Sequence, residues 1–278
     1  MKHSEPARTV VPAANEFARE LEAARVAALA AGEIVRRYYR DRGFQIDQKG
    51  KDNPVTTADF EADRKLKEIL HGGFPEYGWL PEETADDGAR LRRERVWIVD
   101  PLDGTKEFIK GIPEFVVAIA LTDRGVPVVG VSYNPISNEL FMGARGTGVL
   151  LDGAPARVTP RDSLANARVL ASRSETSRGE WKSYEGRIKI DPIGSVAYKL
   201  ALVAAGRADA TFTLTPKSEW DIASGTLLVR EGGGRVTDLD GREIRFNQPS
   251  VKLNGFLATN GLLHGAVEQM LPHRPRRK

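Results

Sequence analysis

Acidic residues that follow a short apolar segment are the first feature of this sequence that could do chemistry. The segment Val96–Val99 is fully apolar, and the run Asp100-Pro101-Leu102-Asp103-Gly104-Thr105 follows it directly. An apolar run of this length predicts a buried strand that ends at Asp100, and we expect the Pro-to-Gly turn to fold Asp103 back beside it. Two carboxylates this close repel each other unless a cation lies between them. Because oxygen ligands favour hard ions, the pattern indicates a magnesium site with the Thr105 hydroxyl beside it; an ordinary Asp-Gly turn is the alternative.

Further acidic residues stand at the ends of other predicted elements. The run Pro81-Glu82-Glu83 lies in a predicted loop, Asp59 follows Thr56 at the start of a predicted helix, and Asp221 opens a later helix. Each has an alternative role: Glu82 as a solvated loop charge, Asp59 as a capping residue, and Asp221 as an acid favoured by the helix dipole. Together they add to the carboxylates that a metal could bind.

Residue types that are absent or scarce exclude several kinds of site. The sequence has no cysteine, which excludes disulfides, thiolate zinc sites and cysteine nucleophiles. It has four histidines, and no motif surrounds His71 or His264, so a Ser-His-Asp triad or a histidine zinc site has no support. No phosphate-loop or dinucleotide-binding glycine motif follows a predicted strand, and Gly232–Gly234 indicates a helix end and a turn.

Composition and charge favour a soluble globular protein that acts on small molecules. Of the 278 residues, 41% are hydrophobic and 28% are charged, and no apolar run approaches the roughly 18 residues of a membrane span. The N-terminus lacks the apolar stretch of a secretory signal, so we expect a cytoplasmic location. The net charge is +3, but Arg274, Arg276, Arg277 and Lys278 carry four positive charges. The rest of the chain is therefore nearly neutral, and we expect a solvated tail and no nucleic-acid partner.

The pattern of apolar residues predicts two subdomains. Residues 13–40 read as an amphipathic helix that packs in a core or at a homodimer contact, and 58–70 as a second helix. Residues 115–151 predict an antiparallel meander, because turn signals separate short apolar runs. Strand and helix patterns then alternate, with strands near 168–172, 188–191, 210–214, 235–238 and 255–259 and helices near 195–206, 221–231 and 262–270. We expect an α+β subdomain over 1–157 that carries most metal ligands, and an α/β subdomain over 158–278 that completes the site.

These segments together resemble the lithium-sensitive inositol monophosphatase superfamily over nearly the whole chain. The two signatures are WIVDPLDGTKEF (Trp97–Phe108) and EWDIASG (Glu219–Gly225). Supporting segments are DNPVTTAD (Asp52–Asp59), PEE (Pro81–Glu83) and GSVAYKLALVAAGRAD (Gly194–Asp209). The Lys-Glu-Phe after Asp-Gly-Thr is most similar to the branch of 3′(2′),5′-bisphosphate nucleotidases, which includes the bacterial CysQ proteins. The resemblance implies a layered αβαβα sandwich and inhibition by lithium.

The same resemblance implies a phosphatase that uses two or three magnesium ions and a metal-activated water, without a phosphoenzyme. Thr105, with Asp59 or Glu82, would activate the water. The implied metal ligands are Glu82, Asp100, the Leu102 carbonyl oxygen, Asp103 and Asp221. The implied substrate-binding residues are Leu102, Asp103, Gly104, Thr105, Gly194, Ser195 and Asp221.

The resemblance limits the substrate to a small phosphorylated metabolite. The preferred expectation is hydrolysis of the 3′-phosphate of 3′-phosphoadenosine 5′-phosphate, with inositol-1-phosphate or a sugar bisphosphate as the alternative. A metal- or nucleotide-binding regulator without turnover is a less favoured third hypothesis. Lys217 could meet a second phosphate or be a surface lysine, and Lys51 and Asp52 could line the cleft or merely begin a loop.

A different class of phosphatase has its own sequence cue. The run Asp238-Leu239-Asp240-Gly241 resembles the Asp-x-Asp-Gly start of haloacid-dehalogenase-like enzymes, in which the first Asp becomes phosphorylated. Arg242 stands where that class needs a Thr, and only 37 residues follow, too few for its core. A hairpin turn is the preferred interpretation.

Overall fold

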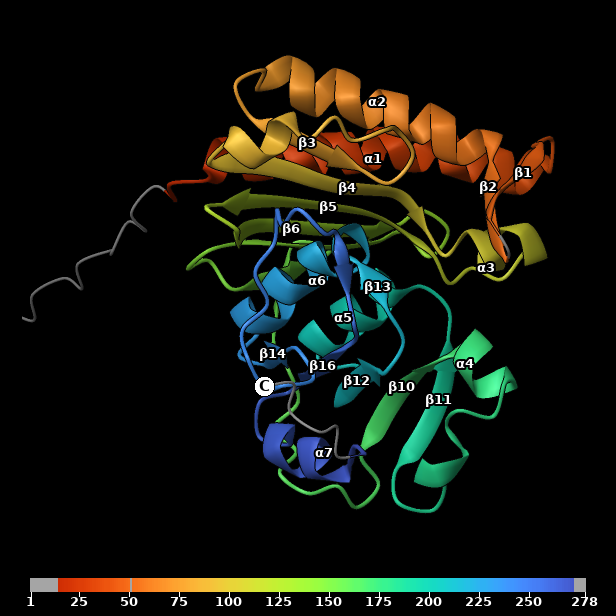
Figure 1. The fold of residues 1–278 in the computed structure, drawn as a ribbon, viewed down its shortest axis with the longest axis vertical. Coiled ribbons are helices and arrows are strands. Elements are labelled where there is room, and N and C mark those ends of the chain that lie inside the picture. Colours follow the sequence, from red (N-terminus) through yellow and green to blue (C-terminus); the bar gives the residue numbers. More distant parts are fainter. Residues whose placement is uncertain (1–14, 51, 273–278) are drawn as a thin grey trace, which may run out of the picture.

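Five layers of helices and sheets make up the fold in the computed structural model, which describes residues 15–50 and 52–272. Figure 1 shows a helix pair above a large sheet, a second helix pair below that sheet, then a smaller sheet, and finally short helices at the far end. The layered αβαβα sandwich expected from the sequence is confirmed.

The outer helix pair covers one face of the large sheet. Helix α1 is Ala18–Asp41, and α2 is Thr57–Gly73. The α1 prediction began too early, because the helix starts at Ala18; residues 13 and 14 lie outside the described part. The apolar stripe of α1 is buried against α2 and the sheet, so it serves the core. A homodimer stays a prediction.

The large sheet has seven strands in the order β3-β4-β5-β6-β7-β8-β9. Strands β3 and β4 are parallel, and every later pair is antiparallel, which confirms the predicted meander. Its strands are β3 (Gly78–Pro81), β4 (Arg95–Asp103), β5 (Val116–Asp123), β6 (Val126–Asn134), β7 (Glu139–Ala144), β8 (Val149–Leu151) and β9 (Ala154–Ala156). The sequence predicted that the strand containing Val96–Val99 ends at Asp100. This is wrong, because β4 continues to Asp103.

Short elements flank β4 at both ends, and the acidic run lies at its C-terminal end. A hairpin of β1 (Ile46–Gly50) and β2 (Asn53–Thr56) leads into α2. Helix α3 (Thr105–Lys110) follows β4 directly, and the 3₁₀ helix η1 (Ala89–Arg92) precedes it. None of these four elements was predicted, since each is too short to show a periodic pattern.

The second half supplies the inner helices and the smaller sheet. Helices α5 (Val196–Ala204) and α6 (Glu219–Glu231) lie between the two sheets. The smaller sheet has the order β11-β10-β12-β16-β14, with parallel and antiparallel pairs. Its strands are β10 (Arg168–Ser172), β11 (Lys189–Ile193), β12 (Ala210–Thr213), β14 (Arg235–Thr237) and β16 (Phe256–Thr259). Minor elements are α4 (Arg173–Ser177), the 3₁₀ helix η2 (Lys182–Tyr184), α7 (His264–Met270) and the ladder of β13 (Lys217–Ser218) with β15 (Lys252–Leu253).

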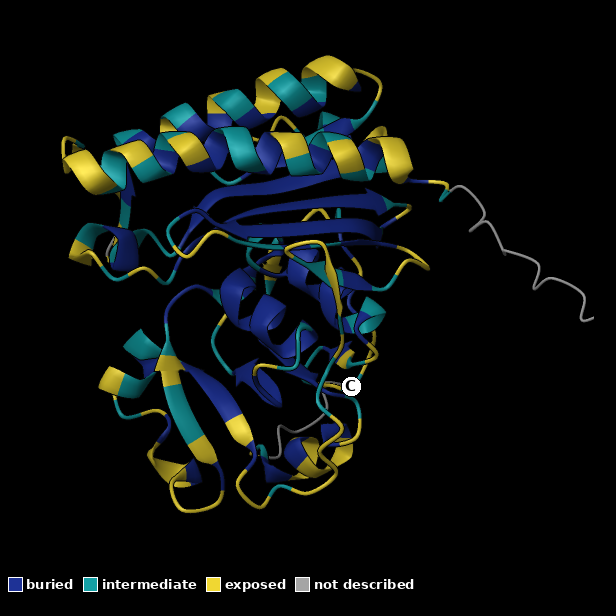
Figure 2. Cartoon of the chain, turned by 180° about the vertical axis from the view of Figure 1, so that it is seen from behind, coloured by how far each residue is buried: buried dark blue, intermediate teal, exposed yellow. Residues whose placement is uncertain are grey.

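Helix α6 joins the two halves through its packing. It is buried almost all round (Figure 2), as expected for a helix with apolar or small residues on every face. A Cβ at Gly225 would lie 2.3 Å from the Leu200 Cβ, so this glycine allows α6 to pack closely on α5. One hydrophobic core includes strands of the large sheet together with both inner helices. The subdomain boundary at 157 and 158 stays a prediction.

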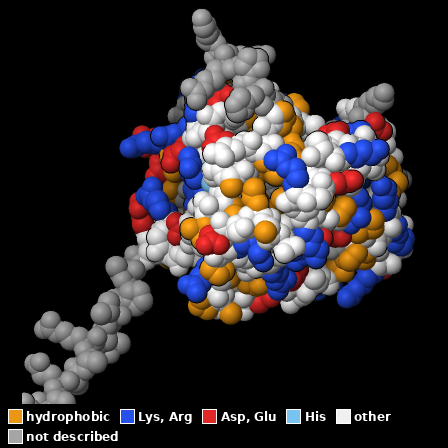
Figure 3. All heavy atoms as spheres, turned by 90° about the horizontal axis from the view of Figure 1, so that it is seen from below, with side chains coloured by type: hydrophobic (Ala, Val, Ile, Leu, Met, Phe, Trp, Pro, Cys, Tyr) orange, Lys and Arg blue, Asp and Glu red, His pale blue; other side chains and the backbone are white. Residues whose placement is uncertain are grey.

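Three remaining sequence expectations concern the surface. Among the described residues, every helix is too short or too polar to traverse a lipid bilayer. Basic and acidic side chains are interspersed on the face shown in Figure 3, without a broad basic stripe. The basic tail lies outside the described residues.

Asp238 forms a turn by accepting the backbone N–H groups of Asp240 and Arg242. The expected hairpin is wrong, because β14 pairs with β16.

Candidate active site

A polar pocket of about 250 Å³ opens where the end of β4 meets the starts of α3, α5 and α6. Its lining includes all the acidic residues of the predicted metal site, namely Glu82, Asp100, Asp103 and Asp221. Leu102, Gly104, Thr105, Gly194 and Ser195 also line it. The sequence-predicted residues therefore come together in one place, apart from Asp59, which contacts the pocket through Thr105.

A β-bulge brings Asp100 and Asp103 into the same pocket. Side chains three positions apart on a regular strand point to opposite faces. In β4, Asp100 pairs with Ala118 and Asp103 pairs with Val116, so three steps on β4 match two steps on β5. The extra residue re-aims the strand. The prediction that a Pro-to-Gly turn brings the two side chains together is wrong. The prediction that the two carboxylates lie close together is confirmed.

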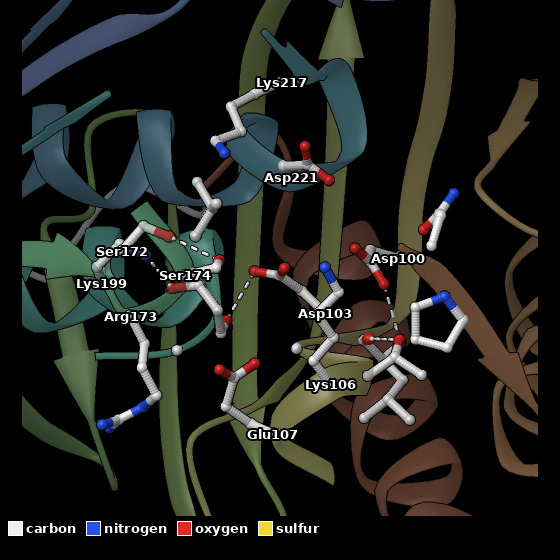
Figure 4. A pocket seen from close by; sticks show the side chains of 18 of the residues that line it. Asp100, Asp103, Lys106, Glu107, Ser172, Arg173, Ser174, Lys199, Lys217 and Asp221 are labelled. Carbon is white, nitrogen blue, oxygen red and sulfur yellow. Dashed lines mark hydrogen bonds between the residues drawn. The ribbon is translucent and has the colours of Figure 1, made fainter. Parts of the chain in front are cut away.

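Asp221 completes a group of three carboxylates with Asp100 and Asp103. One oxygen from each lies within 4.8 Å of the others. Asp221 is the third residue of α6, where its Oδ2 accepts the Ser218 N–H at 2.7 Å in a capping box. Figure 4 shows the three carboxylates arranged around the same opening.

Protein donors fix one oxygen of each of these carboxylates. Asp100 Oδ1 accepts the Leu102 N–H at 2.9 Å. Asp103 Oδ2 accepts the Ser195 hydroxyl at 2.7 Å and a backbone N–H at the start of α5 at 2.5 Å. Together with the hydrogen bond from the Ser218 N–H to Asp221, these contacts hold all three side chains in place. The second oxygen of each carboxylate is left available to a cation.

The electrostatics of the group are unfavourable without a cation. Burial raises the pKa of Asp100 well above its usual value, and repulsion from Glu82, Asp103 and Asp221 raises it further. Burial also raises the pKa of Asp221 to about 7, with Asp103 adding to the shift. A divalent cation would offset this repulsion. The residues therefore fit magnesium: they offer only oxygen, they are already oriented, and their charges lack full compensation.

Glu82 lies beside this group but has a cationic partner. Its Oε1 accepts Lys49 Nζ at 2.6 Å, and the same ammonium bonds Glu83 at 2.9 Å. Lys49 comes from β1, so the hairpin closes over the loop that carries the two glutamates. Nothing local in the sequence around Lys49 signals this contact, since it depends on how the hairpin folds over the loop.

Thr105 and Asp59 form a second connection in the site. The Thr105 hydroxyl lies 3.0 Å from Asp59 Oδ1 and 3.1 Å from the Leu102 carbonyl oxygen. Asp59 Oδ2 accepts both the backbone N–H of Thr56 at 2.8 Å and its hydroxyl at 2.5 Å. Burial raises the pKa of Asp59 to about 6, although these hydrogen bonds oppose the shift. The predicted capping role of Asp59 is confirmed.

The backbone has an uncommon conformation at two turns that line the pocket. Gly104 has a φ of 109°, and a Cβ there would lie 2.9 Å from the Glu114 carbonyl oxygen. Ser195 has a φ of 56°, an uncommon value for a residue other than glycine, at the N-cap of α5. Strained backbone of this kind concentrates at functional sites.

A basic wall, which we define as Arg173, Lys199 and Lys217, lines the pocket on the side of α4, α5 and β13. Lys199 is buried, which lowers its pKa to about 8 even though Asp103 opposes the shift. Arg173 Nη2 bonds Glu114 at 2.5 Å. Lys217 is mostly buried and bonds Glu175 at 3.2 Å, so it is not an ordinary surface lysine. Sequence reasoning missed Arg173 and Lys199, because isolated basic residues carry no signal of which cavity they face.

The remaining sequence expectations can be placed relative to the pocket. Asp52 lines it, whereas Lys51 lies outside the described residues. Asp238 and Asp240 are not among its lining residues. His264 is buried between two threonine hydroxyls at 3.0 and 3.1 Å and is not among the lining residues of the pocket.

Known proteins match this chain over nearly their full length. An inositol-1-monophosphatase of Mesorhizobium japonicum is 36% identical over 257 residues, which is 89% of this chain and 96% of that protein. The structure of the extragenic suppressor protein suhB from Bartonella henselae is 33% identical, with a TM-score of 0.80, and the match covers 91% of this chain and 98% of that one. CysQ from Bacteroides thetaiotaomicron is 31% identical, with a TM-score of 0.72, covering 88% and 98%. The model of the inositol monophosphatase family matches residues 18–272, and the chain belongs to that family of phosphatases.

Proposed function

We propose that the protein is a magnesium-dependent phosphatase that removes the 3′-phosphate of 3′-phosphoadenosine 5′-phosphate. The observation that carries this choice is that three cations line the same pocket as the carboxylates. Asp100, Asp103 and Asp221 form the carboxylate group, and the basic wall lies beside it, with Lys199 near Asp103 and Lys217 near Asp221. A substrate with two phosphates could place one at the carboxylate group and the other against these cations.

The carboxylate group would hold the magnesium ions. Asp100, Asp103 and Asp221 would bind them through the oxygens left free by the protein donors, with Glu82 and the Leu102 carbonyl oxygen as further ligands. When bound, magnesium would neutralise the phosphate oxygens, lower the pKa of the attacking water and stabilise the leaving oxygen. Glu82 would have to exchange Lys49 for a metal.

The water would be held and deprotonated by Thr105 and Asp59. The Thr105 hydroxyl donates to Asp59, which leaves its oxygen free to accept a hydrogen bond from a water. A carboxylate with a pKa of about 6 is suited to accept a proton near neutral pH. Glu82 is the alternative partner of Thr105 in this role.

The phosphate that is removed would lie against the turns at Gly104-Thr105 and Gly194-Ser195. Both turns line the pocket next to the carboxylates. A Cβ at Gly194 would lie only 2.3 Å from Glu107 Cγ, so this position requires glycine. The Gly194 N–H donates to Glu114 Oε2 at 2.7 Å, so a phosphate would have to replace Glu114 at this donor. Backbone N–H groups in such turns bind phosphate oxygens well.

A phosphate-release assay with magnesium across three substrate classes tests this proposal. We expect kcat/KM to be highest for 3′-phosphoadenosine 5′-phosphate and lower for inositol-1-phosphate and fructose-1,6-bisphosphate. The variant Lys217→Met should lower kcat/KM for the nucleotide bisphosphate, and Lys252→Met, whose ammonium bonds Ser218 outside the pocket lining, is the matched control. A preference for inositol-1-phosphate in the wild type would contradict the proposed substrate.

Hydrolysis of inositol-1-phosphate is the second candidate function. It is favoured by relatives such as the inositol-1-monophosphatase of Mesorhizobium japonicum. The basic wall argues against it, because a monoester with an uncharged ring gives these cations no second anion. The same assay separates the two candidates.

A further inference from the structure

The basic wall contains a cation that a buried carboxylate holds in place. Glu175 lies on α4, and its side chain is only 3% exposed. It is not among the lining residues of the pocket, whereas its partner Lys217 is. A buried carboxylate needs several donors to offset the loss of hydration.

Glu175 has four such donors, three from the stretch 213–217 and one from Trp181. Oε1 accepts the hydroxyls of Thr213 at 2.6 Å and Thr215 at 2.7 Å, and Lys217 Nζ at 3.2 Å. Oε2 accepts the Trp181 indole N–H at 3.3 Å. Burial opposes ionisation, but Lys217 and the hydroxyls outweigh it and hold the pKa of Glu175 below its usual value. The carboxylate is thus a fixed negative charge behind the pocket wall.

The Lys217 ammonium is directed by these contacts but is not saturated by them. It donates to Glu175 and, at 3.3 Å, to the Thr215 hydroxyl. An ammonium carries three N–H donors, so one donor remains for a ligand, counting acceptors among the described residues. In Figure 4 the side chain extends from β13 toward the opening, on the side of Asp221 and Ser174.

We propose that Glu175 is a positioning residue that holds Lys217 against the pocket so that its free N–H donor binds the second anionic group of the substrate. This inference rests on the proposed bisphosphate substrate. A lysine has a flexible side chain whose ordering costs conformational entropy. Glu175 would meet that cost during folding, before the substrate binds.

Binding of two ligands that differ by one phosphate tests the role of Glu175 apart from catalysis. Dissociation constants of 3′-phosphoadenosine 5′-phosphate and adenosine 3′-phosphate are measured by calorimetry with calcium in place of magnesium, and a phosphate assay verifies that neither is hydrolysed. The wild type should bind the bisphosphate more tightly. Glu175→Gln should reduce this ratio about tenfold, which matches the loss of one hydrogen bond to a charged group, while binding of adenosine 3′-phosphate stays unchanged.

A double-mutant cycle with Lys217→Met tests whether Glu175 acts on the binding ratio through Lys217. If Glu175 acts through Lys217, Glu175→Gln should change the binding ratio in the wild type but not in the Lys217→Met background. Asp209→Asn is the matched control, because Asp209 is equally buried, bonds Arg161 at 3.1 Å and lies outside the pocket lining. Its ratio should equal that of the wild type.

Three results would overturn the inference: an equal ratio in Glu175→Gln and the wild type, an undiminished effect without Lys217, or no preference for the bisphosphate in the wild type. If Glu175→Gln does not fold, Glu175→Asp replaces it; this variant keeps the charge but withdraws it from Lys217, and it should also lose the preference. Magnesium-dependent turnover is measured separately, so failure to hydrolyse the 3′-phosphate would contradict the proposed function while the binding ratio still decides the role of Glu175.

Discussion

The Thr105 hydroxyl lies 3.0 Å from Asp59 Oδ1, which connects the first turn of α3 with the first turn of α2. The other oxygen of Asp59 is held by Thr56 in the capping box. Asp59 therefore caps the start of α2 with one oxygen and accepts the Thr105 hydroxyl in the candidate active site with the other. Asp221 uses the same arrangement at the start of α6.

Replacing the Thr105 hydroxyl should abolish most activity without unfolding the protein. Thr105→Val keeps the shape but removes the group that links Asp59 to the water, and we expect kcat to fall by roughly 10²–10⁴. Thr105→Ser retains the hydroxyl and should keep most activity. Steady-state kinetics with circular dichroism measure both effects, and a valine variant with normal kcat would remove Thr105 from the mechanism.

Neutralising Asp100 should stabilise the metal-free protein. Asp100 is 1% exposed, and neighbouring carboxylates repel it. Asp100→Asn retains an oxygen for the Leu102 N–H and should raise the unfolding free energy by about 1–3 kcal/mol in EDTA. Magnesium should stabilise the wild type but not this variant. Thermal unfolding with and without magnesium tests this, with the exposed Asp240→Asn as control; destabilisation of Asp100→Asn in EDTA would contradict the electrostatic argument.

His264 should make stability depend on pH below neutrality. Burial lowers its pKa to about 4, and Arg235 adds to the shift. The unfolded state therefore binds the proton more readily, so the contribution of His264 is present above its unfolded pKa and is lost as the pH falls toward 4. Urea unfolding of wild type and His264→Gln between about pH 7.5 and 4.5 should show their difference shrink by up to roughly 2 kcal/mol. A constant difference would be inconsistent with a buried neutral imidazole.

Adding a methyl group at Gly225 should disturb the inner helix pair. The new Cβ would lie 2.3 Å from Leu200 Cβ, and overpacking of this kind costs typically about 1–3 kcal/mol. Gly265→Ala is the matched control, since nothing lies within 4 Å of a Cβ at this helical glycine. Chemical unfolding should show a loss of stability for Gly225→Ala alone; equal stabilities would mean that α5 and α6 do not cross as closely as described.

Sequence reasoning found the acidic residues because their chemistry is local. Asp100 and Asp103 stand together in the chain, and Asp59 and Asp221 both follow a helix-capping residue. Long elements were also predictable, since α1 and the meander repeat their apolar pattern over many residues. Their ends were less certain, as the extension of β4 to Asp103 illustrates.

The features that sequence reasoning missed depend on contacts between distant segments. The bulge in β4 is defined only by its register with β5. Lys49 meets Glu82 across 33 positions, and Lys217 meets Glu175 across 42. A single sequence holds no periodic signal for such pairs, so the basic wall and the closure by the hairpin emerged only from the folded structure.

Anomalous diffraction from a crystal soaked in manganese, which binds to the same oxygen ligands as magnesium, tests the central claim most directly. The account predicts a metal peak within bonding distance of Asp100, Asp103 and Asp221, and its loss in Asp103→Asn. An active enzyme whose manganese peak lies away from these three carboxylates would contradict it.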